Sequence, residues 1–222
     1  MTIWTPKEAV GIKSQWAPEK KGRWDESNIL VYSTELRQER ILHLENVYRY
    51  MWHYFSEEGW KASDSIGSVE DNKRYENFYG EYRDQEGHKE IRFWWRMQKE
   101  CAGIGGSHPY FQYKVYVDVL TTHMKRIEIM YKGQKIKPYV GEFILWFNSI
   151  LILDRNKWFT KDGPLSVFAD FFPRMMYKDR IREQEIELRR FSERFVEDLK
   201  FFIGLNRFNA VRQPLEPEKQ WL

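Results

Sequence analysis

One apolar stripe along the predicted last helix limits the folds that this chain can adopt. Ile181, Leu188, Phe195 and Phe202 follow each other at intervals of seven residues, and charged residues fill most positions between them. This spacing places the four side chains on one face of a helix, which we predict over residues 175–203. An apolar face of this length needs a surface to cover it. The strand-rich region before the helix provides the large apolar surface that can cover this face.

Most of that region alternates apolar and polar residues, a pattern typical of strands that are buried on one side. One amphipathic helix interrupts it, which we predict over residues 39–58 with Gly59 as its stop. A second, short helix is predicted to open at Asp162-Gly163-Pro164. Loops are expected at 61–73 and at the Gly-rich stretch 101–109. Strands are predicted at 29–36, 75–83, 88–99, 111–119, 125–131, 134–140 and 142–154, the last of which could also be helical.

The element order predicts a single α+β domain over residues 28–204. We expect a curved antiparallel β-sheet wrapped around the long C-terminal α-helix. A chain of 222 residues is long enough to bury one sizeable core. Residues 1–27 contain three tryptophans among prolines and charges, and residues 205–222 are again rich in proline. We predict that both are extended arms and that the first packs on this domain or on a neighbour.

The segment GEFILWFNSILILD (141–154), followed by a long charged helix, resembles the corresponding part of the helix-grip fold of the START and polyketide-cyclase-like (SRPBCC) superfamily. The resemblance covers about residues 28–204 and rests on element order, because no catalytic motif is present. It implies an apolar cavity between the sheet and the terminal helix. It also implies a binding protein for lipids, sterols, cyclic polyketides or other apolar ligands, in a family where many members have no enzymatic activity.

The aromatic content agrees with a cavity of this kind. Aromatic residues make up 17% of the chain and include ten tryptophans. Rings in such number suit a wide core or a ligand cavity. We expect the cavity to be lined by inward-facing residues of two strands and of the last helix, namely Phe93, Trp95, Tyr113, Val115, Val117, Phe195 and Leu199.

A second candidate surface lies on the opposite side of the same strands. Arg92, Trp94 and Arg96 face outward from one strand, and Lys114 and Tyr116 face outward from another. Rings and guanidinium groups in alternation can stack on bases and neutralise phosphates. The same residues also suit an ordinary solvated face, which the net charge of only +3 favours.

No cofactor or metal site is predicted. None of the five histidines has the spacing of metal ligands. Cys101, Ser107 and His108 lie in the Gly-rich stretch, which we interpret as a connector and not as a catalytic or phosphate-binding loop. One cysteine rules out an internal disulfide and indicates a cytoplasmic protein. The longest apolar run, 143–153, is too short to span a membrane as a helix.

Three functions follow from these features. The first is the binding of an apolar small molecule in the cavity, without catalysis. The second is a structural subunit of a protein or ribonucleoprotein assembly, docked through residues 1–27 and the aromatic region around Trp158. The third is RNA or single-strand binding through the Arg and Trp residues of the sheet.

Overall fold

The computed structural model describes residues 28–62, 75–83, 87–103, 106–131, 134–156, 158–159, 165, 167 and 177–205. Within these ranges it contains strands and two helices in the order strand, helix, strands, helix. The elements are β1 (Asn28–Leu42), α3 (Leu44–Glu57), β2 (Lys61–Ala62), β3 (Glu76–Arg83), β4 (Lys89–Gly103), β5 (Gly106–Arg126), β6 (Ile129–Tyr131), β7 (Gln134–Ile136), β8 (Tyr139–Leu153) and α4 (Lys178–Phe202).

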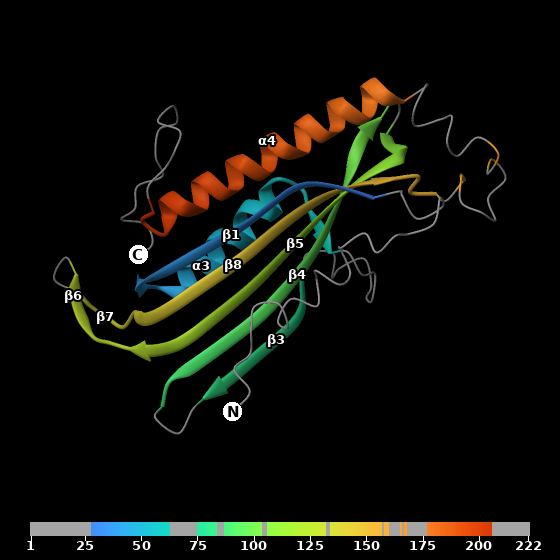
Figure 1. Cartoon of the computed structure of the whole chain (residues 1–222). Helices are drawn as coiled ribbons and strands as arrows, with labels where there is room; N and C mark the ends of the chain where they lie inside the picture. Colours follow the sequence, from blue (N-terminus) through green and yellow to red (C-terminus); the bar gives the residue numbers. More distant parts are fainter. Residues whose placement is uncertain are drawn as a thin grey trace.

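The strands form one six-stranded antiparallel sheet and a separate two-stranded hairpin, β6–β7. The sheet has the order β1-β8-β5-β4-β2, and β3 also pairs with β4. Because β3 pairs with residues 89–95 of β4 and β2 pairs with residues 97–98, the two short strands follow each other along one edge of β4. Figure 1 shows a curved, twisted sheet with α4 lying along it. The predicted α+β class, an antiparallel sheet beneath a long C-terminal helix, is confirmed.

Strand alternation separates the sheet into an inner face, which the helices cover, and an outer face. On the inner face, Trp95 of β4, Val117 of β5 and Phe147 of β8 lie side by side and are fully buried. Their even-numbered neighbours, among them Trp94 and Arg96, point to the outer face. Period-two alternation therefore predicted the orientation of these strands correctly.

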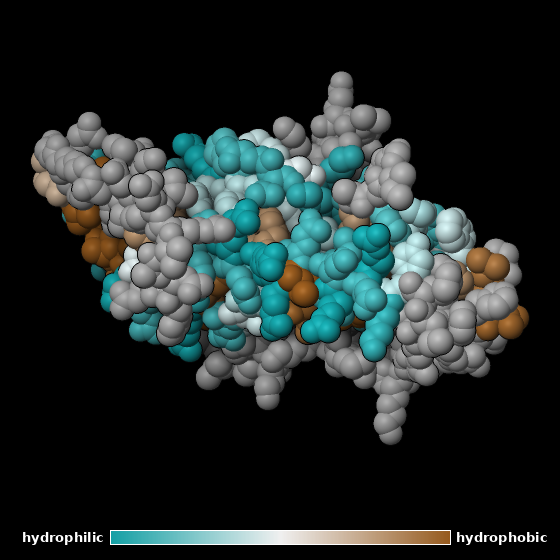
Figure 2. Space-filling model, turned by 90° about the horizontal axis from the view of Figure 1, so that it is seen from above, coloured by the Kyte–Doolittle hydropathy of each residue, from teal (hydrophilic) through white to brown (hydrophobic). Residues whose placement is uncertain are grey.

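The stripe of α4 packs against β8 and β1 on the inner face. Leu188, Phe195 and Phe202 are buried and Ile181 is half-buried, as the spacing predicted. Gly204 ends the helix with a φ of +80°, a conformation that glycine adopts without strain. Seen from above α4, the described residues on this side of the molecule are mainly hydrophilic (Figure 2).

The first helix, α3, packs on the same face of the sheet as α4. Its residues Val47, Met51 and Phe55 are fully buried. The Phe55 ring lies 4.7 Å from the Phe195 ring of α4, measured between centroids. Gly59 follows the helix with a φ of +76°, so the predicted stop is confirmed.

Two predicted boundaries are wrong because strand pairing extends further than local patterns suggest. Residues 39–42 belong to β1, where they pair with residues 139–142 of β8, so α3 begins at Leu44 and not at residue 39. The Gly-rich stretch 101–109 is mostly strand, because β4 runs to Gly103 and β5 resumes at Gly106.

Other predictions are settled or remain untested. Segment 142–154 is strand up to Leu153, which excludes the helical alternative. The predicted pair at 125–131 and 134–140 is shorter than expected, because its outer ends belong to β5 and β8. The predicted arms at 1–27 and 206–222, and the helix start at 162–164, lie outside the described residues.

Candidate functional site

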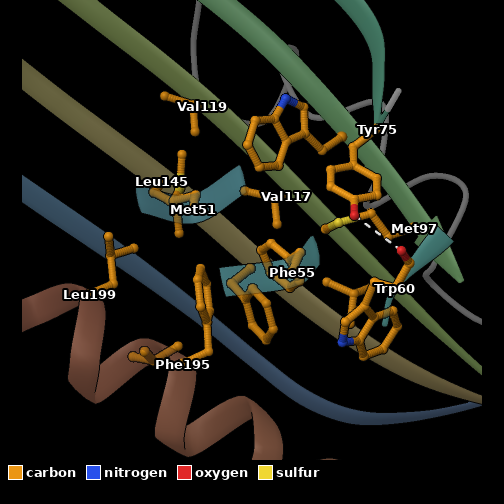
Figure 3. Packing of buried hydrophobic residues seen from close by; sticks show 14 of the residues in the cluster. Met51, Phe55, Trp60, Tyr75, Met97, Val117, Val119, Leu145, Phe195 and Leu199 are labelled. Atoms are coloured by element: carbon orange, nitrogen blue, oxygen red, sulfur yellow. Dashed lines mark hydrogen bonds between the residues drawn. The ribbon is translucent and has the colours of Figure 1, made fainter. Parts of the chain in front are cut away.

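The side chains predicted to line a cavity are all buried on the inner face. They are Phe93, Trp95, Tyr113, Val115, Val117, Phe195 and Leu199. The sequence prediction omitted the contribution of α3 to this region. The ring of Phe55 in α3 lies 6.4 Å from the Trp95 ring, measured between centroids. It also lies 4.7 Å from the Phe195 ring of α4 (Figure 3). Side chains of α3 therefore fill the centre of the predicted cavity, and open space lies at its two ends.

The first open space is a groove of about 530 Å³ between α4 and the end of the sheet, which we call the α4 groove. Its apolar lining comes from the turn that follows α3, from β5 and from α4, namely Trp60, Tyr113, Ile186, Leu188 and Phe191. Charged side chains from the same elements and from β4 complete its lining, namely Glu58, Lys99, Glu183, Glu187, Arg190 and Arg194. The groove thus combines apolar rings with charges of both signs.

Trp60 is held in place by its backbone and by its neighbours. Its N–H donates to the carbonyl of Phe55, and its own carbonyl accepts a 3.0 Å hydrogen bond from the Tyr75 hydroxyl. Figure 3 draws this second bond as a dashed line. The indole ring lies 5.1 Å from the Phe191 ring of α4. Its Nε1 is buried and has no hydrogen-bond partner in the described part of the chain, which typically costs about 1 to 3 kcal/mol.

Tyr113 joins the sheet to α4 at this groove. Its hydroxyl donates a 2.7 Å hydrogen bond to Oε1 of Gln184. Burial, with the nearby Cys101 and Glu187, raises the pKa of the Tyr113 hydroxyl far above its usual value, so the group stays protonated. It is therefore a fixed hydrogen-bonding group and not a base.

The charges of the groove are only partly neutralised by one another. Glu58 lies 3.6 Å from the Lys99 ammonium and 4.0 Å from the Arg194 guanidinium. Lys99 Nζ also lies 6.0 Å from the centroid of the Trp60 ring, at the limit of a cation–π contact. Arg190 forms no ion pair with any residue of the described ranges. Arg190 is therefore available to an anionic group at the groove.

A second groove, also about 530 Å³, lies beside the start of α3, and we call it the β3 groove. Phe93 borders it, together with the rings of Tyr48, Tyr79 and Tyr139. The Tyr48 hydroxyl lies 3.4 Å from Glu76, and burial together with that carboxylate raises the pKa of Tyr48 to about 12. Of the seven predicted cavity residues, Phe93 borders this groove and Tyr113 the α4 groove.

The predicted surface site lies on the outer face, as expected. Its members, Arg92, Trp94, Arg96, Lys114 and Tyr116, are all half-buried. Arg96 binds Asp118 at 2.6 Å, and its guanidinium lies 4.7 Å from the centroid of the Tyr116 ring. Arg92 is paired with Glu90. Each arginine already has a carboxylate partner, which reduces its availability to phosphate.

Asp118 is a residue that the sequence interpretation did not single out. It lies on β5 between Trp94 of β4 and Trp146 of β8 and is 2% exposed. Burial raises the pKa of its carboxyl to about 6, although the Arg96 guanidinium lowers it. The sequence feature that could have identified Asp118 is that an acidic residue stands within the valine-rich run of β5.

The Cys101 thiol and the His108 imidazole have structural roles. Burial raises the pKa of Cys101 to about 12, so the thiol is protonated at neutral pH. Nδ1 of His108 accepts hydrogen bonds from the backbone N–H groups of Tyr110 and Phe111. Burial lowers the pKa of this histidine. This arrangement does not provide an activated nucleophile.

Three further features concern metals, membranes and partners. The described part of the chain contains no cluster of His, Cys, Asp and Glu suited to a metal ion. Within the same ranges, neither helix has the length and apolar character needed to cross a bilayer. Trp158 is 40% exposed, and its backbone N–H donates to the Asp154 carboxylate. Most of the surrounding region, 160–176, lies outside the described residues, as does the predicted docking arm 1–27.

Comparison with known proteins identifies no family for this chain. No protein-family model matches it, and no curated protein matches it. A solved structure of an uncharacterized protein from Rhizobium leguminosarum aligns with 76% of this chain and 97% of its own length. Its sequence identity is 13% and its TM-score is 0.15, so the likeness supports no inference about function.

Proposed function

We propose that this protein binds an apolar, lipid-like small molecule without catalysing a reaction, and that the α4 groove is the binding site. The observation that carries the proposal is an apolar lining of Trp60, Leu188 and Phe191 in an open groove between the sheet and the C-terminal helix. The helix-grip resemblance implies a ligand between the same two elements. The volume of about 530 Å³ lies within the usual range for ligand sites, about 300 to 1,000 Å³.

The polar groups of the groove suit the head of an amphipathic molecule. Arg190 offers a guanidinium that forms no ion pair with the described residues, and it lies on the same helix as Phe191. A ligand could place its apolar part against Trp60 and Phe191 and its polar end near Arg190. Burial of apolar area would supply most of the binding free energy, at about 25 cal/mol per Å².

Native mass spectrometry of the purified protein tests for a co-purifying small molecule. Binding of the fluorescent probe 1-anilinonaphthalene-8-sulfonate then tests the site. Phe191→Ala and Ile186→Gln, both in the α4 groove, should weaken probe binding, whereas Met130→Gln on the exposed β6–β7 hairpin should leave it unchanged. Equal probe binding by all three variants, together with no co-purifying molecule, would contradict the proposal.

A second candidate function is docking within a larger assembly. Its specific support is Trp158, which is 40% exposed although its backbone is fixed by Asp154. An exposed indole on a fixed backbone suits the centre of a protein interface. Trp158→Ala should then abolish co-purification of a partner while leaving the probe binding of the α4 groove intact. Retention of the partner by this variant would exclude docking through Trp158.

A further inference from the structure

The outer face of the sheet contains an apolar strip that is buried. Leu120 of β5 and Ile144 and Ile150 of β8 are 4 to 5% exposed, and Trp146 is 8% exposed. The inward-facing partners of these strands, not these four residues, form the core with the helices. Both described helices pack on the inner face, and the described ranges contain no element over the outer face.

An unsatisfied polar atom lies in the middle of the same strip. Arg96 binds Oδ1 of Asp118, but Oδ2 is buried and has no hydrogen-bond partner among the described residues. On either side of Asp118 are Trp94 and Trp146, and the Trp146 indole N–H already donates to Glu35 at 3.0 Å. A buried carboxylate oxygen without a donor is costly, so a donor from outside the sheet would stabilise it.

The chain itself supplies a segment that can reach this strip. The first residue of β1, Asn28, pairs with Ile152 at one end of the strip, so residues 1–27 enter the sheet there. Twenty-seven residues can extend to about 90 Å. The distance along β8 from Ile152 to Ile144 is only about 26 Å at strand geometry.

The composition of that segment matches the strip. Residues 1–27 contain Trp4, Trp16 and Trp24, each of which joins a large apolar ring to one N–H donor. They also contain five basic side chains, Lys7, Lys13, Lys20, Lys21 and Arg23, that can donate to a carboxylate. Pro6 and Pro18 lack backbone N–H groups and favour an extended path over a further helix.

We propose that residues 1–27 dock across the outer face, with tryptophan rings on Leu120, Ile144 and Trp146 and with a donor to the free oxygen of Asp118. The docked segment would occupy the Arg92, Trp94 and Arg96 surface. This docking is independent of ligand binding in the α4 groove, which lies on the inner face.

Photo-crosslinking in the whole 222-residue chain tests the docking. A benzoylphenylalanine at position 116, on the outer face, should cross-link to peptides from 1–27 of the same chain. A mixture of light and heavy isotope-labelled protein distinguishes cross-links within one copy from those between copies. Position 94 serves as the second site if the first variant does not fold. Position 189, on the exposed side of α4, is the matched control and should give no cross-link to 1–27.

The oxidation rate of Trp146 by hydroxyl radicals gives an independent measurement. Replacement of Trp4, Trp16 and Trp24 by alanine should raise that rate toward the rate of the exposed Trp158, and Trp221→Ala should not change it. Cross-links to residues 206–222, to a second copy or to RNA would overturn the proposal. A folded protein without any cross-link, or an unchanged Trp146 rate in the triple variant, would overturn it as well.

Discussion

The hydroxyl of Ser192 on α4 lies 2.8 Å from the hydroxyl of Ser149 on β8, and both residues are fully buried. Ser192 Oγ also lies 2.7 Å from the carbonyl oxygen of Leu188. A hydroxyl carries a single proton, so Ser192 donates to the carbonyl and Ser149 donates to Ser192. This pair fixes the position of α4 along the sheet within an otherwise apolar contact.

Replacing Ser192 by alanine should destabilise the fold by about 1 to 3 kcal/mol, because the Ser149 hydroxyl loses its partner inside the core. The double variant Ser149→Ala, Ser192→Ala should lose less unfolding free energy than the two single variants lose together. Chemical denaturation of the four proteins gives the free energies of unfolding. Strict additivity would mean that the two hydroxyl groups do not interact.

Asp118 should make stability fall as pH rises between about 4 and 6. Its carboxyl has a pKa of about 6 in the folded protein and 3.8 as the ordinary value, so the folded state holds the proton more tightly. The stability is therefore fully present below pH 4 and is lost as pH rises through 6. The loss amounts to roughly 3 kcal/mol, at about 1.4 kcal/mol per pKa unit.

Asp118→Asn isolates this effect because asparagine does not titrate. Urea denaturation of both proteins from pH 4 to pH 7 gives the difference in unfolding free energy between wild type and variant. As pH rises, the unfolding free energy of the wild type should fall relative to that of the variant. A constant difference would show that Asp118 titrates normally in the fold.

Cys101 should resist alkylation while the protein is folded. A pKa near 12, against 9.0 for an ordinary thiol, lowers the thiolate fraction about 1,000-fold at neutral pH, and burial further limits access. Mass spectrometry after iodoacetamide treatment should find Cys101 unmodified in buffer and modified in denaturant. An added cysteine at the exposed position 189 should react in both conditions. Rapid modification of Cys101 in buffer would contradict the buried placement.

Gly141 on β8 should not tolerate a side chain. A Cβ atom there would lie 2.6 Å from the Met124 sulfur and 2.8 Å from the Thr122 carbonyl oxygen, and that backbone oxygen cannot move aside easily. We expect Gly141→Ala to destabilise the fold by about 1 to 3 kcal/mol. Gly80→Ala is the control, because its Cβ would meet only the end of the Phe78 ring at 3.1 Å. Equal thermal stability of the two variants would contradict this contact.

The strands were predictable because alternation is a local property of the sequence. Phe93, Trp95, Val115 and Val117 face inward as the alternation predicts. Residues 39–42 were misassigned to a helix because their strand partners, 139–142, lie about a hundred residues away. A local pattern cannot distinguish a long strand from a helix start when distant pairing decides the outcome.

The site was predicted only in part for the same reason. The sequence indicates which face of α4 and which strand residues point inward, but not that Phe55 of α3 lies between them. The α4 groove depends on Trp60, which follows α3 and meets Phe191 of α4 only in the folded chain. The carboxylate partners of Arg92 and Arg96 could not be inferred without the strand register.

The position of β1 at the edge of the sheet beside β8 affects how the chain can be assembled during synthesis. Glu35 and Trp146, which hydrogen-bond across these strands, are 111 residues apart. At about 5 to 20 residues per second, the ribosome needs on the order of 5 to 20 s to make β8 after β1. During that time β8, the strand with which β1 pairs, has not yet been made. Folding of the nascent chain is therefore expected to wait for β8, and protection of β1 by a chaperone would be of most value in that interval.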